Sequence, residues 1–211
     1  MITKLIISKD EKLKPKWFLR QAGRHIPEYF TIRNKHKNFI DFCFHEDSII
    51  EATILPLKYY NIDAAILFSD ILLIPHCLGQ EVIFKKNIGP VLKTIQFDSN
   101  FFKKKINFNS LTPIKNAITK ITNKIYLTQD LIGFCGAPWT LACYMLEGSS
   151  SKDYVKTRRF LWNDEETFIK LINKLTNHCA EFLEFQYQAG ATVLMIFDSW
   201  ANMIPDRYNI K

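Results

Sequence analysis

Short apolar runs alternate along the chain with longer segments in which apolar positions recur at helical spacing. The continuous runs at 63–68, 131–134 and 191–197 predict strands that are buried on both faces. The stripes within 110–123 and 164–188 predict amphipathic helices. Buried strands separated by helices predict an α/β fold with parallel strands.

Punctuating residues refine these elements. Ser48 and Glu51 form a capping box, which predicts a helix from Ser48 to about Tyr60. Pro56 inside that helix predicts either a kink or a later start of the helix. Asn163 is the expected N-cap of the helix over 164–188.

Two glycines are expected to end helices. Pro138 suits the first turn of a helix that Gly148 would end, and Gly190 would end the helix over 164–188. The remaining segments are a short strand or hairpin arm over Gln80–Phe84, an irregular stretch over 85–109 and a further helix over 151–161.

Length and composition predict one domain. The chain has 211 residues, of which 47% are hydrophobic, enough for a substantial core. No 18 consecutive apolar residues occur, so a membrane-spanning helix is not expected. The first ten residues lack the long apolar core of a signal peptide, which favours the cytoplasm.

Charge and cysteine content add two expectations. The net charge is +7, but many lysines lie in Lys/Ile/Asn/Phe-rich stretches such as 101–109, so we do not predict nucleic-acid binding. The five cysteines are odd in number and form no Cys-x-x-Cys, which favours reduced thiols over disulfides.

Polar residues follow two of the predicted strands, where parallel sheets carry their sites. Asp70 ends the first of these strands and Ser199 lies just after the last. Upstream, Arg20 and Arg24 flank Gly23, which suggests a pocket for an anionic small molecule because guanidinium groups match carboxylates. An exposed basic loop is the alternative interpretation of the arginines.

Four motifs together resemble the uroporphyrinogen decarboxylase family: WFLRQAGR at 17–24, FSDIL at 68–72, GFCGAPWTL at 133–141 and FDSW at 197–200. The resemblance implies a (β/α)8 TIM barrel that is incomplete at the C-terminus. From the chain length we expect about four of its strands to be present. The same resemblance implies a single domain over 1–211, with an N-terminal segment over 1–47 and a barrel portion over 48–211.

The resemblance also implies roles for charged residues. Arg20, Arg24 and Arg33 would face a tetrapyrrole that carries eight carboxylates. Asp70 would accept hydrogen bonds from the four pyrrole N–H groups and stabilise the positive charge on a protonated pyrrole. Arg20 and Asp70 are the expected catalytic residues, although a carboxylate after a strand can instead be a helix N-cap.

Hydroxyl and apolar side chains complete the implied site. Tyr144 and Ser199 would bind substrate, with a half-buried helix tyrosine and a turn serine as the alternatives. Phe134 and Phe197 would wall the macrocycle, a role compatible with core packing. The full expected set of substrate-binding residues is Arg20, Gln21, Ala22, Gly23, Arg24, Arg33, Asp70, Phe134, Tyr144, Phe197 and Ser199.

The implied activity is that of a carboxy-lyase, which converts uroporphyrinogen III to coproporphyrinogen III by removing four acetate carboxyls as CO2. No metal or other cofactor is expected, and a cytoplasmic homodimer is implied, with no nucleic-acid or membrane partner. The alternatives are a non-catalytic remnant and a zinc-dependent, cobalamin-linked methyltransferase of the same fold. The five histidines show no zinc-ligand spacing.

The sequence departs from the family in three places. The family's C-terminal histidine has no counterpart, and Phe30 stands where many members carry an arginine. The chain stops at Lys211, which suggests a partial record or a truncated gene and an inactive chain on its own.

Overall fold

The computed structural model describes residues 2–10, 12–125, 129–205 and 208. Their contacts form two compact units. The first comprises residues up to Asp70, Asn107–Phe134 and Leu183–Met195, and the second comprises Ile71–Ile106, Cys135–Phe182 and residues from Ile196 onward. The expected limits Met1 and Lys211 lie outside the described residues.

The described elements alternate between helices and strands, as the sequence predicted for an α/β protein. The α-helices are α1 (Ile2–Ser8), α2 (Pro27–Arg33), α3 (Phe39–Cys43), α4 (Glu46–Ile54), α5 (Leu73–Cys77), α6 (Ser99–Lys103), α7 (Thr112–Ile125), α8 (Pro138–Glu147), α9 (Val155–Asn163) and α10 (Glu165–Ala189). Short 3₁₀ helices are η1 (Leu55–Lys58), η2 (Phe108–Leu111) and η3 (Ala201–Met203). The strands are β1 (Ala64–Ile66), β2 (Val82–Lys85), β3 (Gly89–Leu92), β4 (Asp130–Gly136) and β5 (Val193–Phe197).

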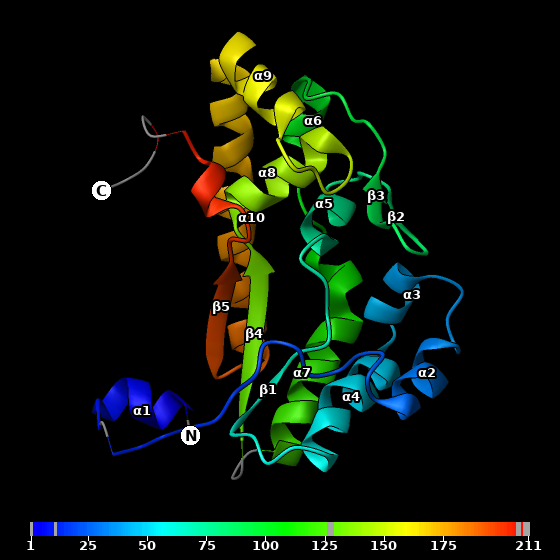
Figure 1. Ribbon diagram of the computed structural model, residues 1–211, viewed down its shortest axis with the longest axis vertical. Helices are drawn as coiled ribbons and strands as arrows, with labels where there is room; N and C mark the ends of the chain where they lie inside the picture. Colours follow the sequence, from blue (N-terminus) through cyan, green and yellow to red (C-terminus); the bar gives the residue numbers. More distant parts are fainter. Residues whose placement is uncertain (1, 11, 126–128, 206–207, 209–211) are drawn as a thin grey trace. The chain divides into compact units, whose positions relative to one another are not determined.

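Three strands form a sheet in the order β1-β4-β5 (Figure 1). β1 and β4 are parallel, with Ala65 opposite Leu131. β4 is completely buried, as its continuous apolar run predicts. Among the described residues the sheet therefore has three strands, one fewer than the four expected.

β5 departs from the prediction of a strand buried on both faces. Its residues alternate between half-buried and exposed, with Leu194 40% and Ile196 57% exposed. Within the described residues β5 pairs only with β4. An apolar run predicts burial only where other elements cover both faces, and the described elements leave one face of β5 open.

Two predicted helix starts are wrong by one or two residues. α4 begins at Glu46, and the ring of His45, rather than a Ser48–Glu51 box, accepts the capping hydrogen bond from the Ser48 N–H at 3.4 Å. Asn163 ends α9, and Asp164 instead accepts from the Thr167 N–H at 3.1 Å. A carboxylate caps a helix as well as an asparagine does, so the sequence alone did not separate the neighbours.

The last part of the expected helix over Ser48–Tyr60 and the segments up to residue 109 also differ from the prediction. The α-helix gives way to η1 at Leu55, and Pro56 lies at this transition. The predicted hairpin arm exists, because β2 pairs with β3 in an antiparallel hairpin. β3 and α6 show that 85–109 is less irregular than expected.

Both glycine predictions are confirmed. Gly148 follows α8 with φ +81° and Gly190 follows α10 with φ +119°, in the backbone region where side chains other than glycine are strained. On α10, the predicted stripe is largely buried and includes Leu171, Leu175 and Gln186, each 0% exposed.

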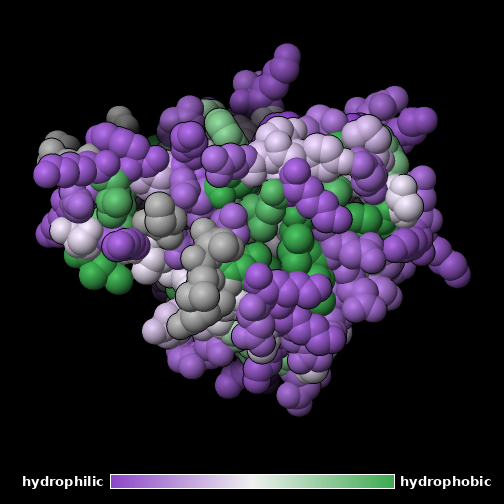
Figure 2. Space-filling model, turned by 90° about the horizontal axis from the view of Figure 1, so that it is seen from below, coloured by the Kyte–Doolittle hydropathy of each residue, from purple (hydrophilic) through white to green (hydrophobic). Residues whose placement is uncertain are grey.

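In the first unit α4 packs along α7, as Figure 1 also shows. The cysteines are free thiols, and all but Cys77 are buried. No helix in the described part of the chain is both long and apolar enough to cross a bilayer. Figure 2 shows hydrophobic side chains among hydrophilic ones on the surface.

Candidate functional site

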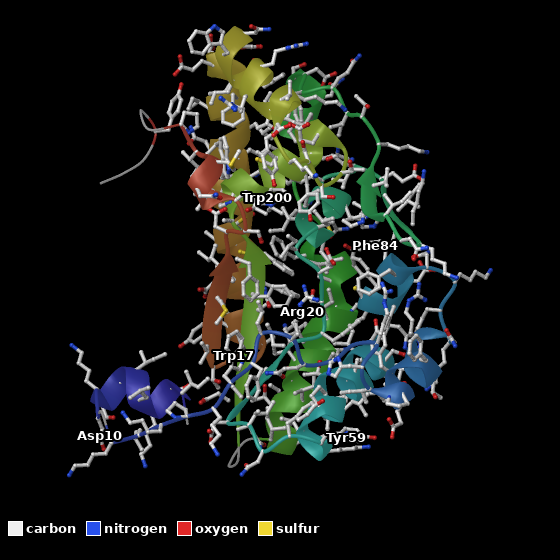
Figure 3. All side chains as sticks on the ribbon, viewed as in Figure 1. Asp10, Trp17, Arg20, Tyr59, Phe84 and Trp200 are labelled. Carbon is white, nitrogen blue, oxygen red and sulfur yellow. The ribbon has the colours of Figure 1, made fainter. Side chains whose placement is uncertain are left out.

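The arginine motif lies on the segment that runs beside β1 before α2 begins. The backbone N–H of Lys16 donates to the Asp63 carboxylate at 2.7 Å, and the Asp63 N–H donates to the Lys16 carbonyl at 2.9 Å. These bonds hold the segment to the start of β1. Arg20 and Arg24 are exposed, and Figure 3 shows Arg20 on this segment. Both a polyanion site and an exposed basic loop predict this exposure.

Three predicted site residues between the arginines are in different surroundings. Gln21 is 3% exposed and its side chain bonds to the β1 backbone. Ala22 is half-buried against the core cluster of the first unit. A Cβ on Gly23 would meet only the His25 ring at 3.4 Å, so no protein contact requires glycine there.

Arg33, the last residue of α2, is half-buried. Its Nη1 donates to the His36 carbonyl at 2.9 Å, and its guanidinium carbon lies 6.0 Å from the centre of the Phe39 ring. A hydrogen bond and a cation–π contact therefore fix the side chain before any ligand binds.

Asp70 is half-buried and follows β1 by four residues. It does not cap the next helix, because α5 begins at Leu73 with no side-chain cap.

The charges of Asp70 and Arg33 both affect the pKa of Cys43. Burial, and next the Asp70 charge, raise the pKa of the Cys43 thiol well above its usual range, while Arg33 lowers it. Asp70 and Arg33 thus act on the same buried thiol.

A second arginine, Arg24, affects the pKa of Tyr29. Burial raises the pKa of Tyr29, and the charges of Arg33 and Arg24 both lower it. Arg33 therefore acts electrostatically on both Tyr29 and Cys43, whereas Arg24 acts on Tyr29 and Asp70 acts on Cys43.

An aromatic cluster supports this arrangement. Phe68, which precedes the Ser69-Asp70 pair, lies with its ring centre 4.3 Å from Phe42 and 6.0 Å from Tyr29. Phe42 is fully buried, and Phe39 packs on Phe68 at 5.8 Å. Packed rings thus connect the end of β1 to the helices that precede it.

In the second unit, contacts with α8 hold the turn after β5. The Thr140 hydroxyl donates to the Asp198 carboxylate at 2.7 Å, and the Trp139 indole N–H donates to the Trp200 carbonyl at 2.9 Å. Ser199 lies between these two anchored residues and is exposed. It does not cap η3, because Trp200 occupies that position without a side-chain cap.

Tyr144 is connected to the same turn. Its ring centre lies 4.5 Å from that of Trp200, whose other ring neighbour is Tyr154 at 4.8 Å. Tyr154 is 5% exposed, and its burial raises the pKa of its phenol to about 12. Tyr144 and Ser199, two predicted substrate contacts, are thus both tied to Trp200.

The two predicted wall residues are a buried and a half-buried phenylalanine. Phe134 is 7% exposed, and its N–H and carbonyl both bond to the Gln186 amide at 2.9 Å. Phe197 is half-buried, and its carbonyl accepts from the Ala137 N–H at 2.9 Å.

Two buried polar atoms near the motifs were not predicted as site groups. The indole nitrogen of Trp17 and the hydroxyl of Ser69 have no hydrogen-bond partner among the described residues. A buried polar group without a partner costs about 1–3 kcal/mol, so these atoms are candidate ligand contacts. Ser69 could have been found from its place beside Asp70, whereas Trp17 carried no comparable signal.

A cavity of about 510 Å³ opens beside the arginine motif in the first unit. Its lining is mostly apolar and includes Arg20 and His25. The lining residues are Phe18, Leu19, Arg20, Gln21, His25, Tyr60 and Ile62. Within the described residues, no three His, Cys, Asp or Glu side chains cluster in a way that could hold a metal ion.

Comparisons with solved structures support the fold class. A methyltransferase from Methanosarcina mazei superimposes with a TM-score of 0.65 at 14% identity, over 92% of this chain and 57% of the other. Because so low an identity says nothing about activity, this likeness defines only the class of fold.

Comparisons of sequence define the family. The family model "Uroporphyrinogen decarboxylase (URO-D)" matches residues 3–208. A uroporphyrinogen decarboxylase from Rickettsia felis is 44% identical over 191 residues, which are 90% of this chain and 55% of the relative. The corresponding Rickettsia rickettsii protein (strain Sheila Smith) is 42% identical over 193 residues, 91% of this chain and 56% of the relative.

The chain therefore belongs to the uroporphyrinogen decarboxylase family, as its motifs indicated. It spans little more than half the length of these relatives.

Proposed function

We propose that this chain forms part of a uroporphyrinogen decarboxylase, and that the whole protein converts uroporphyrinogen III to coproporphyrinogen III. The observation that carries the proposal is the match of the uroporphyrinogen decarboxylase family model to residues 3–208. That match gives Arg24, Arg33 and Asp70, which lie in or near the matched motifs, their chemical meaning. The three-stranded parallel sheet would be part of a single (β/α)8 barrel domain, with 48–211 as its barrel portion.

The arginines would bind the substrate carboxylates. Uroporphyrinogen carries eight carboxylates, and planar guanidinium groups bind carboxylates in two-pronged pairs that fix orientation. Arg20 and Arg24 are exposed and thus accessible to such a ligand, and Arg33 is already held by His36 and Phe39. Backbone at Gln21, Ala22 and Gly23 would lie against the ligand between the two outer arginines.

Asp70 would carry the chemistry. Its carboxylate accepts hydrogen bonds from the inward-facing pyrrole N–H groups of the macrocycle. When a proton adds to the pyrrole α-carbon next to the carbon that bears the acetate arm, the ring becomes positively charged, and a fixed carboxylate stabilises that charge. The bond to the acetate carboxyl then breaks, and its electrons neutralise the ring as CO2 leaves and an exocyclic methylene forms. A proton adds to that methylene to give the methyl group, and the α-carbon loses the proton it had gained, which restores the pyrrole.

The remaining predicted residues would position the macrocycle. Tyr144 and Ser199 offer hydroxyls for a carboxylate, and Trp200 supports both. Phe134 and Phe197 would supply apolar wall. The electron sink is the substrate's own protonated pyrrole, so the proposed reaction requires no metal or organic cofactor. We further propose a cytoplasmic homodimer, and no activity from residues 1–211 alone.

A chimera tests this function. This chain replaces the matched 191-residue region of the Rickettsia felis relative, which restores a protein of full family length. We expect the purified chimera to release CO2 from uroporphyrinogen and to form coproporphyrinogen. A folded chimera without turnover, beside an active parent relative, would instead favour the non-catalytic remnant.

A further inference from the structure

We propose that Gln21 is a positioning residue that fixes the arginine motif on the strand leading to Asp70. This inference rests on the proposed function, because it gives Gln21 a task in the same site. Gln21 does not need to touch substrate for this task. Its contacts are with backbone atoms of β1.

The Gln21 amide uses both of its polar atoms on β1. Its Nε2 donates to the Ala64 carbonyl at 2.9 Å, and its Oε1 accepts from the Ile66 N–H at 3.0 Å. The side chain is 3% exposed, so water competes little for either bond. One amide thus takes the place of a neighbouring strand's peptide group.

These bonds lie on the edge of β1 that faces away from β4. The opposite edge is occupied, since the Leu67 N–H donates to the Ile132 carbonyl at 2.9 Å. On the Gln21 side, the Thr53 hydroxyl continues the series by accepting from the Phe68 N–H at 2.9 Å. Side chains therefore satisfy this edge at Ala64, Ile66 and Phe68, where an edge strand would otherwise expose unpaired backbone.

The consequence for the site follows from chain connectivity. Gln21 is the neighbour of Arg20 and lies three residues before Arg24, while Ile66 lies four residues before Asp70. Two short bonds thus connect the segment with both outer arginines to the strand that leads to the carboxylate. Catalytic geometry tolerates little error, and a 1 Å misplacement can cost about a hundredfold in rate.

Leucine cannot replace this amide. Gln21→Leu keeps a similar volume but leaves the Ala64 carbonyl and the Ile66 N–H buried without partners. Gln21→Glu still accepts from Ile66, yet it donates to Ala64 only when its carboxyl is protonated.

Limited proteolysis measures the anchoring without any ligand. In the purified chain we expect Gln21→Leu to speed tryptic cleavage of the Arg24–His25 bond several-fold. Cleavage of the Arg24–His25 bond is measured because Gln21→Leu changes neither of the two residues that form it. Gln186→Leu is the matched control, since Gln186 makes a similar pair of amide bonds to Phe134 on β4. Equal cleavage in Gln21→Leu and wild type would overturn the proposal, as would equal acceleration by Gln186→Leu.

A double-mutant cycle connects the anchor to binding. The probe is uroporphyrin, the fluorescent oxidised form of the substrate that keeps its carboxylates. We expect Gln21→Leu to weaken its binding about tenfold, a size typical of coupled neighbours, and to have much less effect in an Arg20→Ala background. If Gln21→Leu weakened uroporphyrin binding by the same factor in the wild-type and Arg20→Ala backgrounds, Gln21 would have only a structural role and the positioning proposal would be wrong. The cycle is measured in the chimera with the Rickettsia felis relative, and binding absent from that chimera would contradict the proposed function, while proteolysis would still decide the anchoring.

The conservative variant supplies a pH signature. A buried carboxyl has a raised pKa, so Gln21→Glu resembles the amide while it is protonated. We expect its uroporphyrin affinity, relative to wild type at each pH, to fall as the pH rises through that pKa. A constant ratio would count against the donated bond to Ala64.

Discussion

The rings of Phe42 and Phe68 pack with their centres 4.3 Å apart and their planes at 34°. Phe42 belongs to α3, and Phe68 lies two residues before Asp70. Because Phe42 is fully buried, its ring fixes the place of the strand end within the first unit. The carboxylate proposed for catalysis is thus supported by aromatic packing.

Removal of that ring should be costly. We expect Phe42→Ala to lower the free energy of unfolding by about 3–5 kcal/mol, the usual cost of a large buried aromatic. Phe30→Ala, at a 44% exposed side chain of α2, should cost less than about 1 kcal/mol. Urea denaturation of both variants checks this, and equal losses would show that the Phe42 ring does not support the unit.

The turn with Ser199 should loosen when its bond to α8 is removed. Thr140→Val keeps the side-chain shape but loses the hydrogen bond to the Asp198 carboxylate. Because Asp198 is exposed and can turn to water, the loss should be about 1–2 kcal/mol. Thr176→Val, at an exposed position of α10, is the control and should change stability by less than about 0.5 kcal/mol. The unfolding midpoint is the readout, and an unchanged midpoint in Thr140→Val contradicts the prediction.

Acid should weaken the first unit through His36. Its burial, and next the neighbouring His45 and Arg33, lower the pKa of His36 from 6.5, against a smaller opposing effect of Asp41. A histidine whose pKa is lowered on folding binds its proton less readily in the folded state. Its contribution to stability is therefore present above pH 6.5 and is lost as the pH falls through the lower, folded value.

The matched test replaces that ring. His36→Gln can still hydrogen-bond to the Ser48 hydroxyl, which His36 contacts at 2.8 Å. We expect its unfolding free energy to fall less steeply with acidification below pH 6.5 than that of wild type. His25→Gln, at an exposed ring, should follow wild type. Parallel curves for His36→Gln and wild type would remove His36 as the cause.

The open face of β5 should promote self-association. Ile196 is 57% exposed on a strand that, among the described residues, pairs only with β4. Apolar edge strands are templates for intermolecular pairing, and a lysine blunts them. We expect Ile196→Lys to reduce aggregation of the purified chain in light scattering. Val155→Lys, at a 53% exposed position of α9, should not. An equal reduction of aggregation by Ile196→Lys and Val155→Lys would indicate that the added positive charge, rather than the open face of β5, is the cause.

Local patterns predicted much of the fold because they reflect local physics. The apolar run before Asp70 became β1, and Gly148 and Gly190 ended their helices through positive φ angles. The open face of β5 was not predictable, because burial depends on elements elsewhere in the chain. The choice of Asp164 over Asn163 as cap of α10 was a near-equal competition between adjacent residues.

The sequence identified candidate site residues, but it did not predict the structural role of each one. Motifs identified Arg24, Arg33 and Asp70, and the structure shows the two arginines acting on the pKa of Tyr29 and Arg33 and Asp70 acting on that of Cys43. The structural task of Gln21 could not be read from its motif, because its partners lie more than 40 residues away in β1. Tertiary hydrogen bonds of this kind leave no local periodicity.

Asp70 gives the most direct test of the central claim, in the chimera with the Rickettsia felis relative. Asp70→Asn keeps the shape of the side chain but removes the charge that would stabilise a protonated pyrrole. Loss of one such group costs about 2.7–4 kcal/mol in the barrier, so coproporphyrinogen formation should fall about 10²–10³-fold. Asp153→Asn, at an exposed bend, should leave the rate unchanged. A rate for Asp70→Asn close to that of the unsubstituted chimera would contradict the account.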